Sequence, residues 1–365
     1  MASDLCASED LLSRLSCRPE HLLESMIRIH DPARFLSIKR DARGSSLGSL
    51  DVLPLELLYL TFNVMDFQSL SRICCVSLRG KAVVESLPGY YRLVQHAPRM
   101  LGALARTRLI RFHSTSTLYQ ALLSERCRSC GEFGPFIFLP TCERCCYECL
   151  HRNQSFWVIP TSMAEKCFKL TKHQLEGVPF MCGIPGTYSV GHHVSRKRKV
   201  RLVSVRAAKE VAIKIHGSIA AIAPTGPVMG EGGARIREFH TYKSLLDAPL
   251  EPLSQNPSTL PSQEIAPRDR YCGMASVPFP SLQPDGSVEH GLWCRGCALM
   301  WEDYRFGQLA SDVVTQLSVP EVSTYYVLLG RRQRARSKPE FLEHIKSCHG
   351  ALELAPELRS KRVKE

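Results

Sequence analysis

The sequence predicts a mixed, mainly α-helical fold, in which an N-terminal helical unit precedes an α+β, cysteine-rich domain. Three observations predict it. Leucine and valine recur at helical spacing over residues 53–87, six cysteines fall within residues 127–149, and 44% of the 365 residues are hydrophobic against 22% charged. Such a composition is typical of globular proteins with substantial cores, and the length favours two to three domains.

Breaks in these patterns divide the chain into six predicted segments. Residues 1–46 hold two weakly amphipathic stretches and run into the hinge DARGSSLGSL, which predicts a variable, partly disordered leader. Eight prolines fall between Asp247 and Gly291, and this predicts a linker or loop over 247–290. The other segments are a helical unit at 47–95, a cysteine-rich region with following helices at 96–246, a second Cys/His segment ending in a helix at 291–351, and a basic tail at 352–365.

Residues 53–87 are predicted to form three short helices. Pro54 suits the first turn of a helix, where its missing amide is not needed, and Asp66 caps the second helix. Helices this short bury too little apolar surface to be stable alone, so their excess hydrophobic face is expected to bind a partner. The apolar positions are Leu53, Leu57 and Leu58 in the first helix, Leu70, Ile73, Cys74 and Val76 in the second, and Val83, Val84 and Leu87 in the third.

The spacing of apolar residues also predicts the elements that follow along the chain. FGPFIFLP predicts an apolar hairpin arm, and SFWVIPTSMAEKCFKLTKHQLEGVPF predicts a strand followed by one or two short helices. RLVSVRAAKEVAIKIHG predicts a helix that Gly217 ends. A helical stretch is expected from WCRGC to about Leu317, and EFLEHIKSCHGA predicts a closing helix at 340–351.

Neither a signal peptide nor a membrane span is recognisable. The start, MASDLCASEDLLSRL, is acidic where a signal peptide would be positively charged, and the apolar stretch at 52–65 is too short to cross a bilayer. A soluble protein of the cytoplasm or nucleus, with no membrane partner, is therefore expected. Because reducing conditions there keep thiols free, metal binding explains the 16 cysteines better than disulfides do.

The first cysteine group has the spacing of a four-thiolate zinc site. Cys127 and Cys130 form one Cys-x-x-Cys pair, and Cys146 and Cys149 form a second after a gap of 15 residues. Soft thiolates favour Zn²⁺, and four of them close its coordination shell, so a structural ion is predicted. Cys142 and Cys145 remain open alternatives, either as ligands in place of the second pair or as buried thiols.

A second, more scattered set is predicted in the last third of the chain. Cys294 and Cys297 form another Cys-x-x-Cys pair, and His344 and Cys348 lie four residues apart on one face of the closing helix. These four residues either hold a second zinc ion or are ordinary core residues. No Ser-His-Asp or Cys-His arrangement stands in a motif context, so no catalytic residue is predicted.

The net charge of +12 collects in three runs, SRKRKVR (195–201), RRQRARSK (331–338) and RSKRVK (359–364). Lysine and arginine neutralise phosphates, so a zinc-dependent nucleic-acid-binding or regulatory protein is the alternative function. Short basic runs of this kind are more often solvated loops or import signals.

The pattern Leu53-Pro54-x-Glu56-Leu57, then Met65-Asp66, Leu70 and Val76-Ser77, resembles the F-box over about 40 residues. One departure is Gly80, where many F-boxes carry a tryptophan. Together with CRSC, LPTCERCCYECL, IPGTY, LVSVRAAKE and WCRGC, the layout resembles fungal F-box proteins with a cysteine-rich region over most of residues 50–350.

This resemblance implies a non-catalytic adaptor of a cullin-based (SCF) ubiquitin ligase. The F-box would bind a Skp-type adaptor, which connects it to the cullin scaffold, and the zinc-stabilised region would recruit an unidentified protein for ubiquitination. The resemblance assigns the adaptor-binding face to Leu53, Pro54, Leu57, Leu58, Leu70 and Val76.

Overall fold

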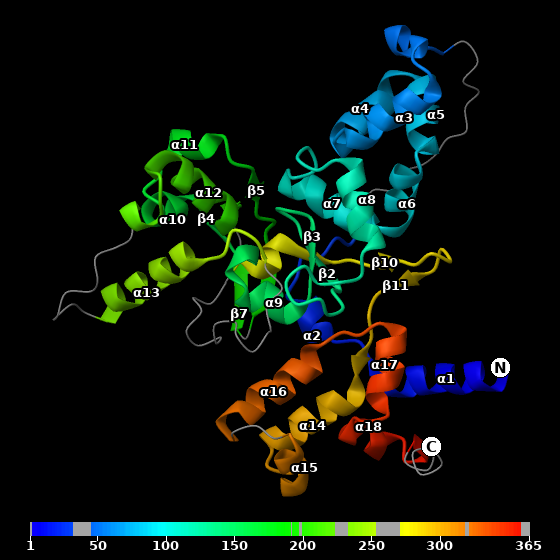
Figure 1. The fold of residues 1–365 in the computed structure, drawn as a ribbon, viewed down its shortest axis with the longest axis vertical. Coiled ribbons are helices and arrows are strands. Elements are labelled where there is room, and N and C mark those ends of the chain that lie inside the picture. The colour runs from blue at the N-terminus through cyan, green and yellow to red at the C-terminus, as the bar shows by residue number, and fades with distance from the viewer. Residues whose placement is uncertain are drawn as a thin grey trace.

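The computed structural model describes residues 2–31, 45–190, 192–196, 199–222, 233–252, 271–317 and 321–358 (Figure 1). The fold is mixed α/β and mainly helical, as predicted. Part of the predicted hinge (41–44), part of the predicted linker (253–270) and the basic run at 359–364 lie outside the described residues. Within the described part, no helix is long and apolar enough to span a membrane.

The three helices predicted at 53–87 are present and stand at one end of the molecule (Figure 1). Asp66 caps the second, accepting a hydrogen bond from the Ser69 amide at 2.9 Å, and Met65 ends the first. The unit is larger than predicted, because the chain continues through three more helices and the last of them packs back against the first. Its elements are η1 (Gly48–Val52), α3 (Leu55–Val64), α4 (Phe67–Val76), α5 (Leu78–Ser86), α6 (Pro88–His96), α7 (Pro98–Thr107) and α8 (Thr115–Leu123).

A small antiparallel sheet lies beside the first cysteine group. The predicted hairpin arm supplies its centre, β2 (Phe136–Phe138), which pairs with β3 (Glu143–Cys145) on one side and β9 (Ser276–Pro278) on the other. After β9, β10 (Ser281–Leu282) pairs with β11 (Val288–Glu289). The prediction of a linker is therefore wrong for residues 271–290. Their prolines occupy strand ends and turns around buried Val277 and Phe279.

A second core forms between a separate three-stranded sheet and the next group of helices. The sheet β4 (Val158–Pro160), β8 (Arg201–Ser204), β5 (Phe180–Cys182) packs against helices around Trp157, Phe168 and Val203. The predicted strand and two short helices are confirmed. The helix that ends at Gly217 is confirmed from Val205 onward, whereas its predicted first residues, Arg201–Ser204, form strand β8. The remaining elements here are α9 (Tyr147–Arg152), η2 (Gln154–Phe156), α10 (Thr161–Cys167), α11 (Lys172–Glu176), β6 (Gly186–Val190), β7 (His192–Arg196), α12 (Val205–His216), η3 (Ala220–Ile222) and α13 (Gly233–Asp247).

The C-terminal part is a helical cluster with its own core. It contains β12 (Trp293–Cys294), α14 (Arg295–Arg305), α15 (Ser311–Gln316), α16 (Glu321–Gln333), α17 (Lys338–Ile345) and α18 (His349–Leu354), and η5 (Cys272–Ala275) precedes it in the chain. The single closing helix predicted at 340–351 is wrong. The chain leaves the helix after Ile345 and starts α18 at His349, with Cys348 as the N-cap of α18.

Residues 2–31 of the predicted variable, partly disordered leader are built into the protein as two helices and a strand. After α1 (Ala2–Leu15), strand β1 (Ser16–Cys17) pairs with β12, and Leu15 is buried in the C-terminal core. Beyond α2 (Glu20–Leu23), the Ile27 amide donates to the Ser276 carbonyl at 3.1 Å. α1 lies beside α17, which brings the first helix next to the C-terminal helices (Figure 1).

Candidate functional site

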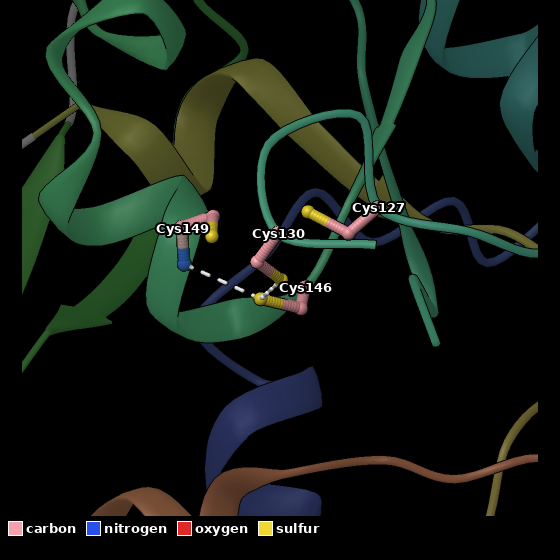
Figure 2. A group of neighbouring side chains, drawn as sticks. All are labelled: Cys127, Cys130, Cys146 and Cys149. Atoms are coloured by element: carbon pink, nitrogen blue, oxygen red, sulfur yellow. Dashed lines mark hydrogen bonds between the residues drawn. The ribbon is translucent and has the colours of Figure 1, made fainter. Parts of the chain in front are cut away.

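The structure brings the four cysteines predicted as the first ligand set into one cluster. The Sγ atoms of Cys127, Cys130, Cys146 and Cys149 all lie within 4.8 Å of one another. Figure 2 shows the four side chains between a loop and the start of α9, with Cys130 and Cys146 in contact. Such a group can hold a metal ion.

Local structure places each pair. Cys127 and Cys130 sit on a tight turn that the Gly131 amide closes by donating to the Cys127 carbonyl at 3.0 Å. The hairpin of β2 and β3 then returns the chain, so that Cys146 becomes the N-cap of α9 and Cys149 lies in its first turn. The Cys149 amide donates to Cys146 Sγ at 3.4 Å. A thiolate at a helix N-terminus is stabilised by the free amides and the helix dipole.

The spacing of the sulfur atoms suits a tetrahedral ion. With metal–sulfur bonds of about 2.3 Å, the edge of a tetrahedron is about 3.8 Å, whereas a disulfide brings the two sulfurs to about 2.0 Å. Cys130 Sγ and Cys146 Sγ are 3.7 Å apart, and all four cysteines of this cluster are free thiols. The distances therefore match ligands around a shared ion.

Cys142 and Cys145 are not members of this cluster. Cys142 Sγ points at the Leu139 carbonyl and Cys145 Sγ at the Phe136 carbonyl. Burial raises the pKa of both thiols well above the ordinary value, which keeps them protonated. The four clustered thiols instead hydrogen-bond one another, which lowers the pKa of Cys127 and raises the pKa of Cys146 and Cys149. Of the alternatives left open by the sequence, the structure places Cys146 and Cys149 in the cluster.

The second predicted set also comes together, although its residues span more than 50 positions. Cys294, Cys297, His344 and Cys348 offer ligand atoms within 4.8 Å of one another. Cys348 Sγ lies 3.8 Å from Cys294 Sγ and 3.7 Å from Cys297 Sγ, again close to a tetrahedral edge. The Nε2 atom of His344 lies 3.2 Å from Cys297 Sγ.

Two helix N-termini meet at this second cluster. Cys294 is the N-cap of α14 and Cys348 is the N-cap of α18, and hydrogen bonds from Cys297 and Cys348 lower the pKa of Cys294 to about 3. Helices α14 and α18 can approach closely because Gly296 and Gly350 face each other. A Cβ added at Gly296 would lie only 2.2 Å from the Ala351 amide nitrogen. The glycine of WCRGC is therefore a requirement of the close contact that brings these ligands together.

The predicted partner-binding residues divide into two groups. Leu53, Pro54, Leu57 and Val76 are exposed. Leu58 and Leu70 are buried, with 2% and 0% of their surface exposed, and they belong to the core of the helical unit. Assigning these two leucines to an exposed face is therefore wrong. The assignment failed because short helices carry apolar residues on more than one side, and spacing alone does not tell which side is covered.

Other exposed apolar residues extend this face and were not predicted. Leu60 and Val64 are 66% and 70% exposed and follow Leu57 by three and seven residues, so the three lie on one side of α3. Leu58 and Phe62 lie on the opposite, buried side. We call Leu57, Leu60 and Val64 the outer stripe of α3. Its spacing is visible in the sequence and is the signal that could have identified it.

Comparison of the chain with protein-family models, with curated proteins and with solved structures found no match.

Proposed function

We propose that this protein is a non-catalytic F-box adaptor, which binds a Skp-type adaptor through α3 and its preceding segment and recruits a protein for ubiquitination by a cullin-based ligase. The observation that carries the proposal is the outer stripe of α3. A surface helix of a globular protein normally has one apolar side. This helix buries Leu58 and Phe62 and also exposes Leu57, Leu60 and Val64, which leaves an apolar surface for a partner to cover.

Two further observations support it. Helices α3, α4 and α5 follow each other with short turns at the positions where the F-box resemblance expects three helices. Leu53 and Pro54, which open that motif, are exposed directly before the outer stripe. The exposed part of the motif is therefore continuous along the chain with the exposed side of α3.

The packing around Gly80 leaves no room for the tryptophan that many F-boxes carry at this position. A Cβ at Gly80 would lie 2.9 Å from Ile73 Cγ2 and 3.0 Å from Leu47 Cδ2. The space beside this position is thus filled by the chain's own side chains, and α4 and α5 pack too closely for a large residue. We infer that the adaptor contact relies on α3 and the segment before it, with no aromatic contribution from position 80.

The two clusters would each hold a structural zinc ion. Four sulfur and nitrogen ligands at tetrahedral spacing suit Zn²⁺ and leave no coordination position for a substrate or a reactive water. The ligands come from separate elements, so a bound ion fastens those elements together. Zinc binding of this kind contributes about 10 kcal/mol or more to folding free energy, which can stabilise a region built on strands of two to three residues.

Affinity purification of the full chain from cells that contain a cullin-based ligase tests the adaptor role. The wild type should recover a Skp-type adaptor and a cullin, and a Leu53→Ala/Pro54→Ala variant should lose both while it keeps its other partners. Ile215→Ala is a matched control, because Ile215 is an exposed apolar residue on α12, outside the helical unit. Equal recovery by all three proteins would contradict the proposal, as would salt-dependent binding of nucleic acid without either ligase subunit.

A further inference from the structure

Arg336 differs from the other basic residues of the run at 331–338, because it is buried and only 5% exposed. Its backbone is fixed by two hydrogen bonds with Leu292, one in each direction, at 2.8 and 2.9 Å. Leu292 lies two residues before Cys294, and Arg336 lies directly before the N-cap of α17, the helix that carries His344. The backbone of Arg336 therefore joins the two chain segments that supply the ligands of the second cluster.

The positive charge of Arg336 has little compensation from ordinary partners. Its Nη1 donates to the Arg334 carbonyl at 3.1 Å, and no carboxylate of the described residues forms an ion pair with it. Arg144, which is 3% exposed, shows what such a buried charge requires. Its guanidinium donates to four backbone carbonyls, those of Gly134, Ala121, Phe279 and Pro280.

The second cluster supplies the opposite charge that Arg336 lacks. Burial, and to a lesser extent the positive charge of Arg334, lower the pKa of Arg336, while the thiols of Cys297, Cys294 and Cys348 act in the opposite direction by stabilising its positive charge. An uncompensated buried cation is strongly unfavourable, so the guanidinium and the thiolates each stabilise the other. The three cysteines that act on Arg336 are all the thiols of this cluster.

We propose that Arg336 is a positioning residue that supplies the counter-charge of the second metal centre and thereby sets its affinity for zinc. Three thiolates, one neutral imidazole and one Zn²⁺ leave a single negative charge, and the buried guanidinium cancels it. Without that cation the loaded centre would be a net anion in a poorly solvated core. This inference rests on the zinc-binding part of the proposed function and is independent of the Skp-type partner.

The test uses the full chain loaded with zinc, in three variants and the wild type. A chelator competition measures the affinity of each centre, and substitution by Co²⁺ distinguishes the four-sulfur centre from the three-sulfur, one-nitrogen centre by its visible spectrum. Arg336→Met should weaken zinc binding at the second centre by roughly 10- to 100-fold, the usual effect of removing an outer partner of a metal ligand. Arg336→Lys, which keeps the charge, should recover most of this loss. Arg331→Met removes an exposed charge of the same run and should change nothing.

The first centre serves as an internal control in every variant and should keep its affinity. Unchanged zinc affinity at the second centre of Arg336→Met would overturn the inference and leave the zinc sites intact. A loss that Arg336→Lys shares in full would also overturn it, because packing would then be the cause. A wild type that holds no ion at the second centre would instead overturn the zinc assignment, and this inference with it.

Discussion

Leu57 and Leu58 are neighbours in the sequence but lie on different sides of α3, one 47% exposed and the other 2% exposed. Leu58 packs into the core of the helical unit with Phe62, while Leu57 belongs to the outer stripe with Leu60 and Val64. The proposed function therefore assigns stability and partner binding to different leucines of the same helix, and substitutions can separate the two.

Stability should depend on the inner leucines. Leu58→Ala or Leu70→Ala removes a fully buried side chain and should lower the free energy of unfolding by about 2–5 kcal/mol. Leu57→Ala changes an exposed residue and should lower it by less than about 0.5 kcal/mol. Denaturant unfolding of the full chain followed by circular dichroism measures the difference. Comparable losses for Leu57→Ala and Leu58→Ala would show that both leucines are covered in solution.

Metal content should distinguish the ligands from the other cysteines of the first group. We expect two zinc ions per chain by elemental analysis, one in each cluster. Cys127→Ser should lose one ion and become sensitive to proteases, because the turn at 127–131 and the start of α9 are no longer held together. Cys142→Ser and Cys145→Ser are the matched controls and should keep both ions, since their thiols point at backbone carbonyls. One ion lost in either control would reassign the ligands.

Gly80 should tolerate no side chain. Gly80→Ala places a Cβ within about 3 Å of Ile73 and Leu47 and should destabilise the helical unit by about 1–3 kcal/mol through overpacking. Gly177→Ala provides the control, because its added Cβ meets no atom within 4 Å and the backbone φ of −78° suits alanine. That control should be neutral or stabilising by up to about 1 kcal/mol. Thermal unfolding compares the two variants, and an equal melting temperature for both would contradict the close packing of α4 and α5.

His113 should make the protein less stable in mild acid. Burial lowers the pKa of His113 from 6.5 to about 4, although a hydrogen bond with the backbone of Leu139 opposes this. Between these two values the unfolded chain binds a proton that the folded chain does not. The resulting stability is complete above about pH 6.5 and is lost as the pH falls toward 4, by about 2 kcal/mol between about pH 7.5 and pH 5.

The measurement compares wild type and His113→Gln by denaturant unfolding across that range, at pH values where both proteins keep their zinc. The variant should show a flatter dependence, because its side chain does not titrate. Parallel curves for the two proteins would mean that His113 is accessible to protons in the folded state.

The local elements of the fold could be read from the sequence, and the long-range ones could not. Pro54, Asp66 and Gly217 mark helix ends by their backbone chemistry, which acts over a few residues. Strand β9 is an edge strand that pairs with β2 and lies among prolines, and strand β1 is two residues long. Both are stabilised by partners far away in the chain, so neither leaves a periodic pattern.

The ligand sets followed from spacing because Cys-x-x-Cys pairs form compact turns by themselves. Spacing alone does not distinguish Cys146 and Cys149 from Cys142 and Cys145 as ligands. The structure does, because the hairpin of β2 and β3 places Cys146 and Cys149 at the start of α9. His344 and Cys348 were paired for a wrong reason, since they lie on two helices and not on one. Burial of Arg336 inside a basic run carries no sequence signal at all.

The central claim is that the outer stripe of α3 binds a Skp-type adaptor, and a binding titration between the purified full chain and a purified adaptor tests it most directly. We predict a saturable one-to-one complex with the wild type and with Ile215→Asp. The Leu57→Asp/Leu60→Asp variant should keep the wild-type melting temperature but bind at least 100-fold more weakly, which corresponds to a loss of about 3 kcal/mol in binding free energy. A wild type that does not bind any Skp-type adaptor, or a double variant that binds as tightly as the wild type, would contradict the claim.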